Sequence, residues 1–325
     1  MAEPRVVLLS DNLADGMLPT LRDAYPQLDV RLVPFDDEVR PEYLEAEVLL
    51  RSGMSDELFR GILARSPRLA WVQVTAAGFD WIRCPELDER VTRDGMLVTR
   101  SESSYNVPIA EYVVAAIMFS AKRFGDMRQA QEAHVWDRFM AKDVGGSLVA
   151  VFGTGAIGAE VAWRCTALGA RVVGVSRSGR HVEGFDEVIT PDRADPLLAD
   201  ADFVVLAMPL TVETENMIGE PQLRTMRSDA VLVNVGRGAL VDDGALLRAL
   251  REGWIGGAVL DVFREEPLGA DSPFWDAPRT VVTPHTSFRS SGNVARLLND
   301  FRVNLDLYLA GAPLRGTMKE PALGY

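Results

Sequence analysis

Short runs of apolar and β-branched residues recur along the chain, separated by polar or helical segments. In the first hundred residues the runs lie at 5–10, 30–33, 48–51, 69–74 and 96–100. A second set lies at 148–152, 171–175, 203–207, 230–235, 257–261 and 280–283. The spacing of the second set fits parallel strands joined by crossover helices. Because the runs are continuously apolar rather than alternating, we expect buried strands in two parallel α/β sheets.

Two longer patterns have helical periodicity. Asn106 and Pro108 begin an apolar segment that continues to about residue 124, which predicts a helix with proline in its first turn. The stretch 291–310 predicts a second helix, since its apolar residues share one face: Val294, Leu297, Leu298, Phe301, Leu305 and Leu309. The segment 126–143 is polar apart from isolated aromatic residues, and we expect it to be a connecting arm.

The apolar run at 148–152 leads directly into the glycine-rich sequence GTGAIG, which is followed by a helical pattern ending near Gly169. A buried strand, a tight turn and a helix N-terminus together can bind the pyrophosphate of a dinucleotide. The first glycine permits the turn, the second lets the backbone approach the phosphates, and the third allows close packing of helix on strand. A purely structural turn is the alternative. We predict cofactor binding by Gly153, Gly155, Ala156, Ile157 and Gly158.

The segment after the next strand bears on the choice of cofactor. A site for NAD usually has an acidic residue there, which binds the ribose hydroxyls. This chain instead has Ser176, Arg177 and Ser178, with Arg180 two residues further on. Arginine can bind a 2′-phosphate through two hydrogen bonds, whereas a carboxylate would repel it. We therefore predict NADP in preference to NAD, the alternative being a solvated polar loop.

Polar residues also follow three later strands of the same predicted sheet. Ligands bind at the carboxyl edge of open α/β sheets, so these strand ends are candidate site positions. Arg237 lies between two glycines, where its guanidinium could hold a carboxylate and polarise a neighbouring carbonyl oxygen. A structural ion pair with a nearby aspartate is the alternative for this arginine.

His285 follows Pro284 at another of these strand ends and suits a general acid that protonates a ketone oxygen. Glu266 could accept a hydrogen bond from the second ring N–H, fix the tautomer and favour the charged imidazole. Glu265 is the adjacent alternative, although the Glu-Pro-Leu context favours Glu266. A histidine with only a structural role is the alternative for His285.

Composition narrows the classes of partner. The 325 residues suggest two domains, and the net charge of −13 argues against a nucleic-acid binder. Cys84 and Cys165 stand far apart without metal-ligand spacing, which argues against a metal site and favours a reducing compartment. No run reaches the roughly 20 apolar residues of a membrane span, and the N-terminus lacks a signal-peptide pattern. We expect a cytoplasmic protein without nucleic-acid or membrane partners.

Taken together, the motifs resemble the D-isomer-specific 2-hydroxyacid dehydrogenase family over nearly the whole chain. The resemblance rests on GTGAIG at 153–158, NVGRGALVDDGALLRAL at 234–250, GAVLDVFREEPL at 257–268 and TPH at 283–285. In that family Arg, Glu and His at these positions form the catalytic set. The Ser-Arg-Ser segment and the end of the chain look most like the glyoxylate/hydroxypyruvate reductase branch. The sequence Thr-Ser-Phe-Arg-Ser after the histidine departs from the commonest pattern, which has smaller residues.

The resemblance implies two Rossmann-like or flavodoxin-like α/β domains. A dinucleotide-binding domain at 104–288 would be inserted into a substrate-binding domain formed by 1–103 and 289–325, and the protein would be a homodimer. Asp261 would lie near the nicotinamide carboxamide, and the strand ends carrying Pro209 and Val235 would contact the cofactor. Backbone N–H groups of a loop of small residues would hold the substrate carboxylate, at Ala76, Ala77 and Gly78.

The expected activity is reduction of a small 2-oxo acid, such as glyoxylate or hydroxypyruvate, to the D-2-hydroxy acid by NAD(P)H. The reaction would take place in a cleft between the domains, with hydride from the nicotinamide and a proton from His285. One alternative is a dinucleotide-sensing, corepressor-like binding protein on the same fold. Another is a formate-dehydrogenase-like enzyme, although that branch typically pairs glutamine with the histidine, where this chain has Glu266.

Overall fold

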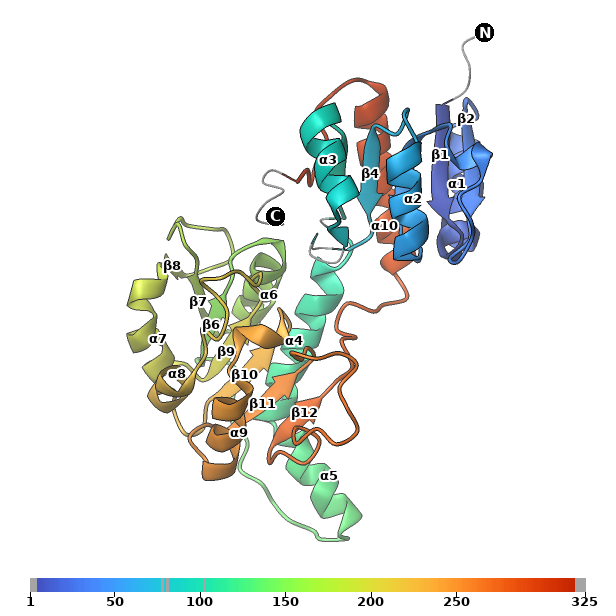
Figure 1. The fold of residues 1–325 in the computed structure, drawn as a ribbon. Coiled ribbons are helices and arrows are strands. Elements are labelled where there is room, and N and C mark those ends of the chain that lie inside the picture. Colours follow the sequence, from blue (N-terminus) through green and yellow to red (C-terminus); the bar gives the residue numbers. More distant parts are fainter. Residues whose placement is uncertain (1–4, 77–78, 80–81, 102, 319–325) are drawn as a thin grey trace. The chain divides into compact units, whose positions relative to one another are not determined.

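The computed structural model describes residues 5–76, 79, 82–101 and 103–318. The chain divides into two compact units, Met1–Tyr105 with Ser290–Tyr325, and Asn106–Arg289. Each unit is built on one sheet whose strands are all parallel (Figure 1). The predicted α/β class with two parallel sheets is therefore confirmed. Within the described residues, no helix is both long and apolar enough to cross a lipid bilayer.

The first unit has a five-stranded sheet with the order β2-β1-β3-β4-β5, which is the flavodoxin-like order. Helices α1 and α10 pack on one face of it, and α2 and α3 on the other. Trp71 of β4 stacks on Phe301 of α10 with 5.4 Å between ring centroids. The strands are β1 Arg5–Ser10, β2 Leu28–Val33, β3 Ala46–Arg51, β4 Trp71–Val74 and β5 Leu97–Arg100. The helices are α1 Ala14–Ala24, α2 Asp56–Arg65, α3 Pro85–Asp94 and α10 Asn293–Leu309.

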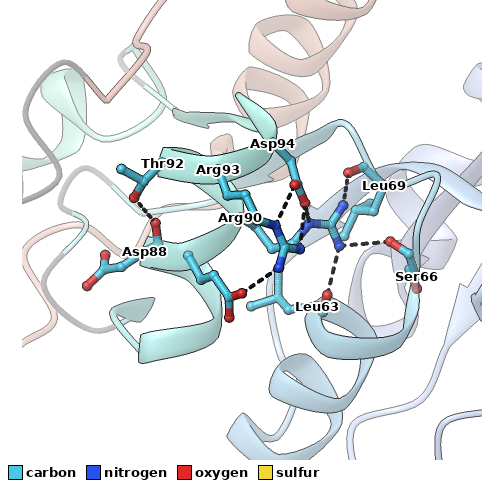
Figure 2. A network of polar contacts seen from close by, with 9 residues as sticks. Leu63, Ser66, Leu69, Asp88, Arg90, Thr92, Arg93 and Asp94 are labelled. Atoms are coloured by element: carbon cyan, nitrogen blue, oxygen red, sulfur yellow. Dashed lines mark hydrogen bonds and ion pairs between the residues drawn. The ribbon is translucent and has the colours of Figure 1, made fainter.

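A buried arginine joins two helices of this unit. Arg90 of α3 donates hydrogen bonds to the carbonyl oxygens of Leu63, Ser66 and Leu69, at and beyond the end of α2 (Figure 2). Its Nε lies 2.6 Å from Asp94 Oδ2. Because the last carbonyls of a helix have no partner within the helix, the guanidinium both satisfies these oxygens and ties α3 to α2.

The second unit has a seven-stranded sheet with the order β12-β11-β10-β9-β6-β7-β8, in which the strand order reverses between β6 and β9. This is the Rossmann arrangement, and ligands bind such sheets at the carboxyl ends of the strands beside the reversal. The strands are β6 Leu148–Phe152, β7 Arg171–Val175, β8 Glu187–Ile189, β9 Phe203–Leu206, β10 Val231–Asn234, β11 Gly257–Leu260 and β12 Thr280–Val282.

Helices cover both faces of this second sheet (Figure 1). Helices α7, α8 and α9 bury their apolar residues against one face. Helix α4 packs against α6 and contacts β10. The helices are α4 Asn106–Ala121, α5 Phe124–Glu132, α6 Ala156–Ala167, α7 Ala194–Asp200, α8 Glu220–Thr225 and α9 Asp243–Glu252.

One sequence expectation needs correction, and one short strand was not foreseen. The segment 126–143 is not wholly an arm, because most of α5 falls in it. This helix buries none of its residues and includes the exposed ion pair Arg128–Glu132, so it has no apolar face for periodicity to reveal. Strand β8 was also not predicted, because it has only three residues, of which Ile189 alone is fully buried.

Candidate active site

Three neighbouring strands of the second sheet bring the candidate catalytic residues to one edge. Asn234 of β10 pairs in register with Leu260 of β11, which in turn pairs with Val282 of β12. The segments that follow these three residues therefore leave the sheet side by side. They carry the predicted site residues Arg237, Asp261, Glu266 and His285.

His285 and Glu266 form a close pair. The Nδ1 atom of the imidazole lies 2.7 Å from Glu266 Oε2, and Glu266 Oε1 accepts a hydrogen bond from the Phe263 N–H at 2.9 Å. Because a carboxylate only accepts hydrogen bonds, Nδ1 carries the proton of this pair and Nε2 is the ring atom left for a ligand. The ring of Phe288 meets the imidazole edge-on, with centroids 5.8 Å apart. Glu266, rather than Glu265, is thus the partner of Nδ1.

The backbone of His285 is held in an unusual conformation. Its φ of 48° lies in the left-handed region, which costs a residue with a side chain about 1–2 kcal/mol. The His285 N–H donates to the Asp261 carbonyl oxygen at 2.8 Å. The carboxylate of Asp261 is completely buried and accepts the N–H groups of Thr286 at 2.8 Å and Ser287 at 2.9 Å. Asp261 therefore fixes the chain on both sides of the imidazole.

The turn that positions Arg237 is stabilised by two hydrogen bonds of the Asn234 side chain. The Asn234 amide accepts from the Gly236 N–H at 3.1 Å and donates to the Arg237 carbonyl oxygen at 3.0 Å. A Cβ at Gly238 would collide with the backbone of Phe263, so glycine is needed for the close approach of the two loops. The half-buried guanidinium donates from Nη1 to the Gly236 carbonyl oxygen at 2.8 Å.

The glycine-rich turn after β6 has the shape that a pyrophosphate requires. Gly153 has a φ of 105°, and a Cβ there would lie 2.6 Å from the carbonyl oxygen of Ala207, which follows β9. A Cβ at Gly158 would collide with the Gly153 carbonyl oxygen. Gly155, at the start of α6, has open space where a Cβ would project, among the described residues. The exposed N-terminus of α6, with Ala156, therefore offers N–H groups to an anion.

The end of β7 presents hydroxyl and guanidinium groups. Ser176 Oγ is buried and has no hydrogen-bond partner within the part of the chain that the structure describes. A buried hydroxyl without a partner is costly, so this atom fits a position that a ligand completes. Arg177 and Ser178 are exposed beside it. The pKa of Glu213 lies below its ordinary value, first because of a hydrogen bond from Thr211 and, in smaller part, because Arg177 is near.

The remaining predicted residues are more scattered. Pro209 is exposed in the loop after β9, and Val235 is buried directly after β10. Ala76 is partly exposed after β4 of the first unit. The predicted substrate-loop residues Ala77 and Gly78 lie outside the described residues.

Two residues that sequence reasoning missed touch this site. The Tyr112 hydroxyl of α4 lies 2.7 Å from Thr283 Oγ1, which in turn donates to Asp261 Oδ1 at 2.5 Å. The one available signal was a phenol within the otherwise apolar segment 112–118. That signal does not say what the hydroxyl contacts.

Known proteins resemble this chain in sequence. The family model described as D-isomer specific 2-hydroxyacid dehydrogenase, NAD binding domain, matches residues 114–287. A glyoxylate reductase from Korarchaeum cryptofilum is 34% identical, over 81% of this chain and 80% of its own length. The chain belongs to the D-isomer-specific 2-hydroxyacid dehydrogenase family.

Solved structures are similar over the full length. A D-isomer specific 2-hydroxyacid dehydrogenase from Xanthobacter autotrophicus, in complex with NADPH and MES, has a TM-score of 0.84 at 29% identity, covering 100% of both chains. An NADPH-dependent glyoxylate/hydroxypyruvate reductase from Sinorhizobium meliloti, in complex with NADP and sulfate, has a TM-score of 0.82 at 25% identity, covering 99% of this chain and 100% of the other.

The protein is therefore an oxidoreductase of this family, with a domain that binds a nicotinamide dinucleotide. The predicted resemblance to the family and to its glyoxylate reductase branch is confirmed. Its relatives are dehydrogenases and reductases, which favours an enzyme over a dinucleotide-sensing binding protein.

Proposed function

We propose that the protein reduces glyoxylate, hydroxypyruvate or a similarly small 2-oxo acid to the D-2-hydroxy acid with NADPH. The observation that carries the proposal is the 2.7 Å contact between His285 Nδ1 and Glu266 Oε2 at the carboxyl edge of a Rossmann sheet. An imidazole held in this way on a carboxylate is a suitable general acid for a ketone oxygen.

The chain's own residues divide the remaining tasks. The dinucleotide would be held by the turn at Gly153, Gly155 and Gly158, and it supplies a hydride when bound. Glu266 holds the proton of Nδ1 in place, so the proton on Nε2 is the one delivered to the substrate oxygen. Arg237 would pair with the substrate carboxylate and polarise its carbonyl group.

Further residues are assigned by the family pattern. The backbone at 76–78 of the first unit would donate to the substrate carboxylate. The second unit would bind the cofactor, with Ala156, Ile157 and Val235 near it, Pro209 lining the loop after β9, and Asp261 near the nicotinamide. These assignments follow positions in the motifs rather than contacts with a ligand.

The preference for NADP rests on the end of β7. Ser176, Arg177 and Ser178 stand where an NAD site usually has an acidic residue, and the Ser176 hydroxyl has no partner among the described residues. The solved relatives from Xanthobacter autotrophicus and Sinorhizobium meliloti are complexes with NADPH and NADP. Arginine and serine together fit a 2′-phosphate.

We also propose a homodimer formed through the arm after α4. Several large apolar side chains of this arm are exposed, and Trp136 and Met140 are 94% and 88% exposed. Trp136 lines a hollow of about 420 Å³ together with Met127, Val135 and Phe139, among others. Exposed apolar surface of this kind is typical of a protein interface, and a second copy with the same surface could cover it symmetrically.

The test of the proposed reaction is His285→Ala. Loss of the general acid should lower kcat for glyoxylate or hydroxypyruvate by about 10²–10⁴-fold. The Kd of NADPH, measured by fluorescence titration, should stay within about twofold. Glu266→Gln keeps an acceptor for Nδ1 and should lose less, about tenfold. Turnover of His285→Ala close to that of the wild type would refute the assignment.

A further inference from the structure

A phenol from α4 reaches the loop that carries His285. The Tyr112 hydroxyl lies 2.7 Å from Thr283 Oγ1, although 171 residues separate the two in sequence. The side chain is half-buried, and burial raises the pKa of Tyr112 to about 12, so the phenol keeps its proton at neutral pH. This contact connects α4 to the end of β12, within one compact unit.

The chemistry of the groups fixes the direction of these hydrogen bonds. The carboxylate of Asp261 accepts from the N–H groups of Thr286 and Ser287, and an ionised carboxylate cannot donate. The 2.5 Å contact between Thr283 Oγ1 and Asp261 Oδ1 therefore uses the single proton of the threonine hydroxyl. With that proton committed, Thr283 can only accept from Tyr112. The hydrogen bonds therefore run from Tyr112 to Thr283 and from Thr283 to Asp261, and we call these three residues the relay.

Asp261, the last residue of the relay, holds the backbone around His285 in its conformation. Its carboxylate accepts hydrogen bonds from the N–H groups of Thr286 and Ser287, and its carbonyl oxygen accepts one from the N–H of His285. The left-handed φ of His285 persists only because its surroundings hold it there. We propose that Tyr112 is a positioning residue for His285 and acts through Thr283 and Asp261. This inference rests on the proposed role of His285 as proton donor.

Removal of the Tyr112 hydroxyl should disturb the position of the His285 imidazole. Without a donor from Tyr112, the Thr283 hydroxyl has one partner fewer and is less restricted in rotation. The hold on the buried Asp261 carboxylate then weakens, and the strained backbone at His285 can relax. Proton transfer is sensitive to displacements of about 1 Å. Binding of cofactor and substrate would depend chiefly on the glycine-rich turn and on Arg237, which belong to other loops.

The test uses Tyr112→Phe in the full chain, a change that removes only the hydroxyl. We expect kcat to fall about tenfold, while KM for the 2-oxo acid and Kd for NADPH stay within about twofold. Amide hydrogen exchange of the free protein should become faster in the peptide that spans 283–288. Thr283→Val should cause at least the same loss and Thr283→Ser should retain activity. The double variant Tyr112→Phe with Thr283→Val should lose no more than Thr283→Val alone.

The matched control is Tyr308→Phe on α10. Its phenol also donates to a side chain, Glu47 Oε1 at 2.8 Å, but in the first unit. This variant should leave the exchange of 283–288 unchanged. Wild-type kcat and wild-type exchange in Tyr112→Phe, or a loss confined to KM, would overturn the inference.

The two proposals fail separately. If His285→Ala is inactive and Tyr112→Phe behaves as the wild type, only the relay is refuted. If His285→Ala is active, the proposed reaction mechanism is refuted, and with it any role of Tyr112 in positioning a proton donor. The exchange measurement then still reports whether the hydroxyl orders the loop.

Discussion

Two arginines place positive charge at the ends of strands in a chain whose net charge is −13. Arg237 stands in the turn after β10, and Arg177 stands after β7 beside the buried hydroxyl of Ser176. In the proposed reaction Arg237 would bind the substrate carboxylate and Arg177 the 2′-phosphate of the cofactor. Recognition of these two anions would then depend on local placement of positive charge rather than on the overall charge.

The first prediction at this scale concerns Arg177→Ala. Removal of a guanidinium that binds a 2′-phosphate should raise the Kd of NADPH about tenfold and leave that of NADH within about twofold. Fluorescence titration with both cofactors measures the difference. Arg171→Ala at the start of β7, which removes an exposed ion pair with Glu187, is the control. Equal losses for the two cofactors would contradict the NADP assignment.

At the scale of elements, side chains from one helix or loop secure the end of another. Arg90 of α3 binds three carbonyl oxygens at the end of α2 (Figure 2). Lys142, where the arm returns, lies 2.5 Å from Asp202 and 3.0 Å from Asp229. Hydrogen bonds from Arg227 and Lys142 hold the pKa of Asp229 below its ordinary range.

Arg90→Met should destabilise the first unit. The substitution keeps an apolar stem but leaves buried carbonyl oxygens without donors, at a cost of about 2–4 kcal/mol in the free energy of unfolding. Denaturant unfolding followed by tryptophan fluorescence measures the loss. Arg93→Met on the same helix removes an exposed pair with Glu89 and should leave the free energy of unfolding nearly unchanged. Equal stabilities for the two variants would show that the buried contacts contribute little.

At the scale of the whole molecule, the second unit interrupts the first in the sequence. Large exposed apolar residues of the second unit are most concentrated in the arm around α5. None of the residues of α5 itself is buried. A helix without a buried face gains little stability from its own chain, so contact with a second copy would explain the individual apolar residues that this arm exposes.

We predict that the wild-type protein is a dimer and that the double variant Trp136→Ser, Met140→Ser is a monomer. Light scattering coupled to size-exclusion chromatography reports the mass directly. Trp163→Ser on α6 removes an exposed tryptophan outside the arm and should leave the mass unchanged. A wild-type protein that is already monomeric would rule out the proposed interface.

The sequence by itself determined the two parallel sheets, the glycine-rich turn and the candidate set Arg237, Glu266 and His285. Buried parallel strands and glycine turns leave continuous local patterns, and motif spacing places side chains at strand ends. The helix α5 escaped detection because it has no buried face.

Only the tertiary structure decided which side chains meet at the site. It set Glu266 Oε2 at 2.7 Å from His285 Nδ1, and it brought Tyr112 to Thr283 across 171 residues. Such contacts depend on how strands and helices pack, and no local pattern of residues encodes a hydrogen bond between segments so far apart.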